Sequence, residues 1–204
     1  MIQLKAMFRN CDFKVVNAKF ISSECIRVDD VPKTWNVRSI LRDACLEGNM
    51  YIATIAVTRG GIDWGYGFRE ACTGGHIGMV NFIIKQGVNW NEGLCGACEG
   101  GHIDLAMLMI EHGANEWNDG LRGACEGGHH DLVTLMIEKG AYGWNKGLEY
   151  ACEEGHIDLV RLMIERGATN LNEGLYYASK RGDYYKGRNR NIEKLLIEKG
   201  AERI

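Results

Sequence analysis

The feature that most constrains the fold of this chain is a tandem repeat marked by cysteine. Five cysteines recur every 26 or 27 residues: Cys45, Cys72, Cys98, Cys125 and Cys152. The clearest copy reads "WNDGLRGACEGGHHDLVTLMIEKGA" over residues 117–141. Short units of this kind cannot bury their apolar faces alone, so neighbouring copies must stack. The sequence therefore predicts an elongated solenoid.

We expect six units preceded by a separate segment. The unit boundaries are placed at 34–63, 64–89, 90–116, 117–143, 144–170 and 171–204, with looser first and last copies. Residues 1–33 do not follow the period, and their strand-like stretches "FKVVNAKF" and "ECIRVDDV" predict a β-hairpin cap. The alternative for this segment is a second docking element.

Each unit is predicted to be a helix-turn-helix pair, which makes the repeats all-α. The first helix shows apolar residues at i, i+3 and i+4, namely Leu121, Ala124 and Cys125. Asn118 is expected to cap its N-terminus, and Gly127-Gly128 to end it in a left-handed conformation. The second helix carries Asp131 in its first turn and Lys139 in its last, and Gly140 closes it.

The pattern "GLxxACEGGHIDLVxLMIExGA" resembles the ankyrin repeat over about five sixths of the chain. The resemblance implies an ankyrin-like solenoid and a non-enzymatic interaction scaffold. Two features depart from the family: the unit is shorter than about 33 residues, and "N-x-G" replaces the usual Thr-Pro. Short, blunt connections are therefore expected between units. Shortened, cysteine-rich repeats of this kind are similar to the ankyrin sets of giant viruses of amoebae.

The composition and N-terminus predict an intracellular protein. No run approaches 18 uninterrupted apolar residues, and "MIQLKAMFRNCDFKVV" lacks the apolar core of a signal peptide. We expect a cytoplasmic location, in the host cell if the chain is viral, with the nucleus as an open alternative. A membrane partner is not expected.

The regular cysteines and histidines are interpreted as scaffold. Stacked helices lie about 8 to 10 Å apart, whereas bridged cysteines need Cα atoms within about 7 Å, so the cysteine series should stay reduced in the core. The ankyrin resemblance implies that the turn histidines bond to neighbouring backbone: His76, His102, His129 and His156. No catalytic residue, metal site or cofactor is expected, and the chain is not predicted to be an enzyme.

Cys95 lies outside the regular cysteine series, and four tryptophans form a further series of their own. Cys95 forms a lone CxxC motif with Cys98, and its position is held elsewhere by Arg69, Arg122, Glu149 and Tyr176. This variation predicts an exposed Cys95 beside an inward Cys98. The repeated tryptophans are read as apolar fillers that seal the short loops, with partner binding as the alternative: Trp64, Trp90, Trp117 and Trp144.

The leading functional hypothesis is binding of an unidentified protein partner, a host protein if the chain is viral. Positions that differ between otherwise similar copies are free to serve a partner. Arginine and tyrosine are enriched at interface hot spots. The predicted partner-binding residues on the first helices are Arg69, Arg122, Glu149, Tyr150, Tyr176 and Tyr177.

The alternative hypothesis is nucleic-acid or phosphate binding through a basic insertion in the last unit. Its candidate residues are Lys180, Arg181, Lys186, Arg188 and Arg190. Residues 34–179 hold ten Lys or Arg against nineteen Asp or Glu, which should repel a phosphate backbone. Nucleic-acid binding is therefore expected to be weak and steeply salt-dependent, and we favour the protein partner.

Overall fold

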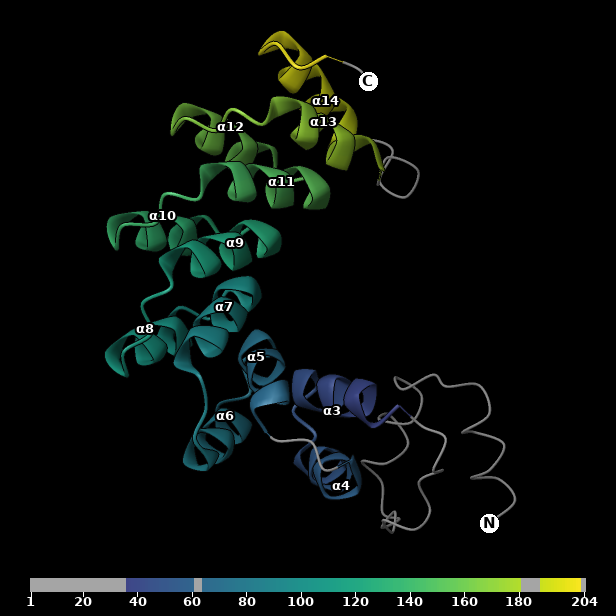
Figure 1. The fold of residues 1–204 in the computed structure, drawn as a ribbon, viewed down its shortest axis with the longest axis vertical. Coiled ribbons are helices and arrows are strands. Elements are labelled where there is room, and N and C mark those ends of the chain that lie inside the picture. Colours follow the sequence, from purple (N-terminus) through teal and green to yellow (C-terminus); the bar gives the residue numbers. More distant parts are fainter. Residues whose placement is uncertain (1–35, 61–63, 181–187, 203–204) are drawn as a thin grey trace, which may run out of the picture.

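The computed structural model describes residues 36–60, 64–180 and 188–202. Regular secondary structure within these ranges is entirely helical, and it forms a curved stack of helix pairs (Figure 1). The all-α repeat architecture predicted from the sequence is thus confirmed. The β-hairpin expected in residues 1–33 and most of the basic insertion lie outside the described residues.

The helices form two layers. The first helices of the pairs line the concave side in Figure 1: α3 (Val37–Leu46), α5 (Gly65–Thr73), α7 (Trp90–Gly100), α9 (Trp117–Gly127), α11 (Trp144–Glu154) and α13 (Leu171–Lys180). The second helices form the outer layer: α4 (Met50–Gly60), α6 (Ile77–Ile83) with the 3₁₀ turn η3 (Ile84–Gln86), α8 (Ile103–Glu111), α10 (His130–Glu138), α12 (Ile157–Glu165) and α14 (Arg188–Glu198). The unit boundaries given above stay a prediction.

The core lies between the layers and repeats with the sequence. In the unit of α9 and α10, Leu121, Cys125 and Met136 are fully buried. The five regular cysteines are all buried and free, which confirms their role as small core residues. The tryptophans pack against this core; Trp90, for example, stacks on the His112 ring with centroids 4.4 Å apart. Packing is therefore the role that the structure supports for them.

A glycine and a histidine build the turn inside the four central pairs, from α5–α6 to α11–α12. Gly128 follows α9 with a φ of 79°, the left-handed conformation expected from the sequence. The Nε2 atom of His102 lies 3.0 Å from the Thr73 carbonyl of the preceding pair. Equivalent contacts of 2.8 and 3.2 Å join His76 to Leu46 and His156 to Glu126. The predicted bond from histidine to neighbouring backbone is confirmed for these three residues.

The predicted capping role of Asn118 is wrong. Helix α9 begins at Trp117, one residue before Asn118, and no side chain caps it. The Asn118 Oδ1 atom instead accepts hydrogen bonds from the backbone N–H groups of Tyr142 and Gly143, at 2.8 and 2.9 Å. The short loop before the next helix leaves these donors without backbone partners, so the amide serves them. The same contact recurs at Asn91, Asn145 and Asn172.

Candidate functional site

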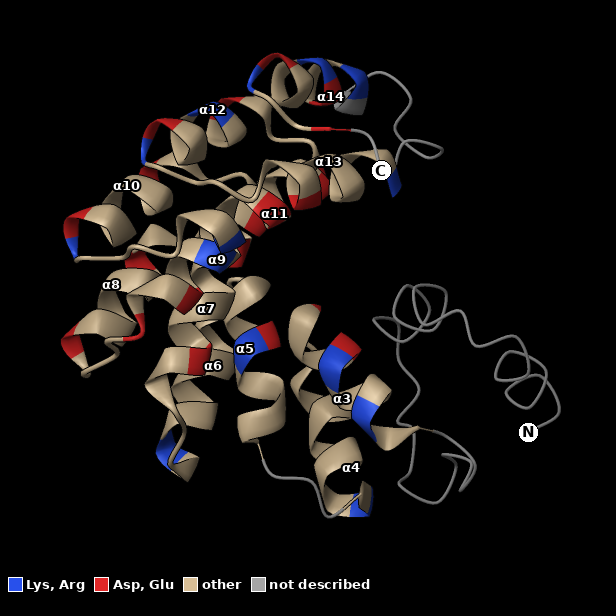
Figure 2. Cartoon of the chain, turned by 45° about the horizontal axis from the view of Figure 1, so that its top comes forward, with Lys and Arg blue, Asp and Glu red and all other residues tan. Residues whose placement is uncertain are grey.

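The concave surface of α5, α7, α9, α11 and α13 is the candidate site, and we call it the first-helix face (Figure 2). Glycine allows its first three helices to pack at backbone distance. A Cβ atom on Gly96 would lie 2.2 Å from the Arg69 carbonyl oxygen, and one on Gly123 would lie 2.5 Å from that of Cys95. Since real side chains do not tolerate such distances, these two positions are fixed by packing.

Close packing also overturns the expectation that Cys95 is exposed. Only 2% of Cys95 is accessible, because the residue lies in the seam between neighbouring first helices. Burial raises the pKa of its thiol to about 11, although the positive charges of Arg69 and Arg122 oppose this rise. Cys95 is therefore a second buried thiol beside Cys98, and a poor nucleophile.

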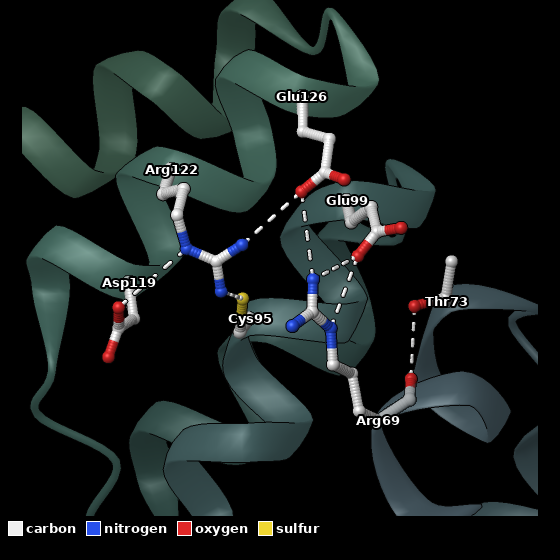
Figure 3. A network of polar contacts seen from close by, with 7 residues as sticks. All are labelled: Arg69, Thr73, Cys95, Glu99, Asp119, Arg122 and Glu126. Atoms are coloured by element: carbon white, nitrogen blue, oxygen red, sulfur yellow. Dashed lines mark hydrogen bonds and ion pairs between the residues drawn. The ribbon is translucent and has the colours of Figure 1, made fainter. Parts of the chain in front are cut away.

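A polar network covers this seam and joins three helices (Figure 3). The Arg69 Nη2 atom lies 2.6 Å from Glu99 Oε2 and 3.6 Å from Glu126 Oε2. The same Glu126 oxygen lies 3.3 Å from Arg122 Nη1, so it links both arginines. These four side chains are only 21–28% exposed. Arg69 and Arg122 therefore hold the helices in register as well as facing solvent.

Glu149 also differs from its predicted placement. It is 8% exposed, because it occupies the same inter-helix seam as Cys95. Its Oε2 atom accepts a hydrogen bond of 2.5 Å from Lys146, whose side chain is 67% exposed. Glu149 is thus a buried carboxylate paired with a surface lysine, and direct contact with a partner would be limited to its edge.

The three predicted tyrosines lie toward the C-terminal end of the first-helix face. Tyr176 is exposed, whereas Tyr150 and Tyr177 are half-buried. The rings of Tyr176 and Tyr177 meet edge to face with centroids 5.4 Å apart. Arg122 lies over the Tyr150 ring, with its Cζ atom 5.4 Å from the centroid. The structure therefore brings Tyr176 and Tyr177 together and connects Tyr150 to the polar network.

An open pocket of about 690 Å³ borders these tyrosines. It is lined by Thr169, Asn170, Leu171, Asn172, Glu173, Tyr176, Tyr177 and Gly200. Glu173 was not predicted from the sequence. It stands three and four residues before the two tyrosines and therefore shares their side of α13. This spacing of three and four residues is the sequence pattern from which Glu173 could have been identified. The loop residues of the pocket had no comparable signal.

The basic insertion is only partly described. Lys180 ends α13, and its Nζ atom lies 5.8 Å from the centroid of the Tyr176 ring. Arg190 is exposed on α14, and Arg188 begins that helix. Arg181 and Lys186 lie outside the described residues. A continuous basic patch thus stays a prediction, and Lys180 belongs to the edge of the tyrosine cluster.

The described ranges hold neither a metal-type cluster nor a membrane-spanning helix. Residues 36–60, 64–180 and 188–202 contain no group of three or more His, Cys, Asp or Glu side chains placed to hold a metal ion. Each helix in this part of the chain is too short or too polar to traverse a bilayer. The described residues therefore form packed helices that present charged and aromatic side chains on one face.

The stacked helix pairs and their turn histidines define an ankyrin-type repeat fold. The chain is similar to the crystal structure of the human ASB11 ankyrin repeat domain, with a TM-score of 0.50 and 20% sequence identity. The similarity covers 79% of this chain and 84% of that domain. No family model and no curated protein matches the chain. The comparison confirms the ankyrin-type fold inferred from the residues.

Proposed function

We propose that this chain is a non-enzymatic scaffold that binds a protein partner through its first-helix face. The observation that carries the proposal is the pairing of Tyr176 and Tyr177 beside an open pocket of about 690 Å³. Exposed aromatic side chains next to a concavity are the usual anchors of protein interfaces. Ankyrin-type solenoids present such residues on a rigid layer.

The six predicted residues have two roles in this proposal. Arg69 joins neighbouring first helices through Glu99 and Glu126, and Arg122 does so through Cys95. Glu149 pairs with Lys146 inside α11 and stabilises that helix. Tyr150, Tyr176 and Tyr177 supply the contact area, since a tyrosine offers a large surface at a low cost in side-chain entropy. If the chain is viral, as its resemblance implies, the partner is a host protein in the host cytoplasm.

The test is partner capture by the full chain from an extract of the cells in which it is made. The variant Tyr150→Ala, Tyr176→Ala, Tyr177→Ala should lose at least about 2 kcal/mol of binding free energy to the captured partner. A matched control removes three exposed apolar side chains away from this face: Ile103→Ala, Met107→Ala and Tyr142→Ala. Both variants should keep the helical circular dichroism of the parent chain.

Two results would contradict the proposal. One is equal capture by the tyrosine variant and the parent chain, and the other is loss of capture by the control alone. The second candidate, nucleic-acid binding through Lys180 and Arg190, has a separate readout. Anisotropy of a labelled single-stranded RNA should show little binding at physiological salt, since the acidic repeats repel phosphates.

A further inference from the structure

The carboxylates at the two ends of the first-helix face differ in whether an arginine of the chain pairs with them. Toward the N-terminal end, Glu99 and Glu126 are neutralised by arginines of the same face. Arg122 is the residue four positions before Glu126 in α9. The charges of these two carboxylates are therefore balanced by residues of the same chain.

The C-terminal half lacks the corresponding arginine. In α11 the residue four positions before Glu153 is Glu149, which takes the place that Arg122 has in α9. The surface lysine Lys146 pairs with Glu149. Glu153 and the exposed Glu173 form no ion pair with another described residue. Figure 2 shows the resulting acidic colour on α11 and α13.

Two of the three tyrosines of this half lie against cations of the same chain. Arg122 lies over Tyr150, and Lys180 lies over Tyr176, at 5.4 and 5.8 Å from the ring centroids. Tyrosine rings attract cations through their negative faces. The pocket beside Tyr176 and Tyr177 also includes the Glu173 carboxylate. An aromatic pair with one carboxylate is a chemical match for a lysine or arginine side chain.

We propose that this pocket, together with Glu153 on the neighbouring helix α11, binds a basic segment of the protein partner, with a lysine or arginine side chain seated between Glu173 and the two tyrosines. The inference rests on the proposed function and names the chemistry of the partner. The excess of acidic residues over the repeats favours approach of a positively charged segment from a distance. The same acidic surface repels phosphate-rich ligands, which are also negatively charged.

The experiment uses a displayed library of random 12-residue peptides selected on the immobilised full chain. Recovered peptides should be enriched in lysine and arginine relative to the unselected library. One recovered peptide, labelled with fluorescein, is then titrated with the parent chain and with Glu153→Gln, Glu173→Gln. We expect this variant to bind about ten-fold more weakly at physiological salt, as one or two charge pairs are lost.

A charge-matched control separates local contact from overall charge. The variant Glu138→Gln, Glu165→Gln removes two exposed carboxylates at the ends of α10 and α12. It should bind the labelled peptide within about two-fold of the parent, because screening weakens charges beyond about 8 Å. Equal weakening by both variants would overturn the proposal, since binding would then follow net charge alone.

The remaining outcomes distinguish this inference from the proposed function. If the recovered peptides are not basic but still require Tyr176 and Tyr177, the basic-segment proposal fails and the interaction face stands. If the peptides bind equally well to the tyrosine variant, both proposals fail. Failure to recover any basic peptide also counts against the basic-segment proposal.

Discussion

The Arg122 guanidinium lies against the Cys95 thiol, with Nη2 3.0 Å from Sγ, although the two residues are 27 positions apart. They occupy equivalent positions in successive repeats, one residue after the core leucine. Their contact shows that this position lies in the seam between first helices. A residue there can vary from copy to copy and still be buried, because its neighbour one repeat away compensates for the change in size and charge.

Cys95 should react slowly with thiol reagents. It is 2% exposed, and a pKa of about 11 leaves only about one thiolate in a thousand at pH 8. Alkylation at pH 8 followed by peptide mapping should find Cys95 modified as slowly as Cys98 and Cys125. Arg122→Ala should accelerate alkylation of Cys95, because uncovering the sulfur outweighs the loss of a positive charge that lowers the thiol pKa. Arg161→Ala on the outer layer should leave the rate unchanged. Native reactivity close to that of the denatured chain would refute this placement.

Two glycines should respond in opposite ways to alanine. Gly123→Ala places a Cβ atom 2.5 Å from the Cys95 carbonyl oxygen, so α7 and α9 must separate at a cost of about 1 to 3 kcal/mol. Gly78→Ala, within α6, meets no atom within 4 Å and should stabilise the chain by about 0.5 to 1 kcal/mol. Urea unfolding of the two variants measures both effects, and destabilisation of equal size would contradict the packing described.

Asn118 should stabilise the chain through its oxygen. Asn118→Ala leaves the N–H groups of Tyr142 and Gly143 without this acceptor, which should cost about 1 to 2 kcal/mol. Asn118→Asp keeps an oxygen there and adds a negative charge in the first turn of α9, where the helix dipole favours it. Thermal unfolding should therefore find the aspartate variant the more stable of the two. Equal losses would show that the amide group acts in another way.

Glu70 should make stability depend on pH. Burial chiefly raises its pKa above 4.5, and the nearby Arg69 opposes the rise. The folded chain then holds this proton more tightly than the unfolded chain, so stability increases as pH falls through the raised pKa toward 4.5. Relative to Glu70→Gln, which cannot ionise, the parent should gain stability as the pH falls from neutral toward 4.5. Glu138→Gln controls for the loss of one exposed charge, and an opposite trend for Glu70 would be inconsistent with its burial.

The sequence was sufficient for the fold because the fold is carried by local repetition. The spacing of Leu121, Ala124 and Cys125 reports one apolar helix face, and its recurrence reports the stacking of that face. The interrupting glycines, such as Gly128, mark where each first helix must end. These signals lie within a few residues of one another, so no knowledge of long-range contacts was needed.

The candidate site was less predictable because it depends on contacts between copies. Variation at Cys95 and Glu149 was read as freedom from packing, whereas both residues fill the seam. Asn118 appeared to be a helix cap, since its bonds to residues 24 and 25 positions away leave no local pattern. The tyrosines were identified from variation between copies and from the enrichment of tyrosine at interfaces. The pocket with Glu173 depends on the arrangement of α13 and the loops beside it, which the sequence pattern does not reveal.

The hydrogen bonds of the asparagines and histidines also affect how repeats can be added to such a chain by duplication. Asn145 bonds to backbone within its own repeat, while His156 bonds to the Glu126 carbonyl of the repeat before it. A second copy of residues 144–170 would place its histidine opposite Glu153, which stands at the position equivalent to Glu126. Duplication of one whole unit in the coding sequence would thus create a junction with its bonding groups already matched, whereas insertion of a partial unit would leave some of them unmatched.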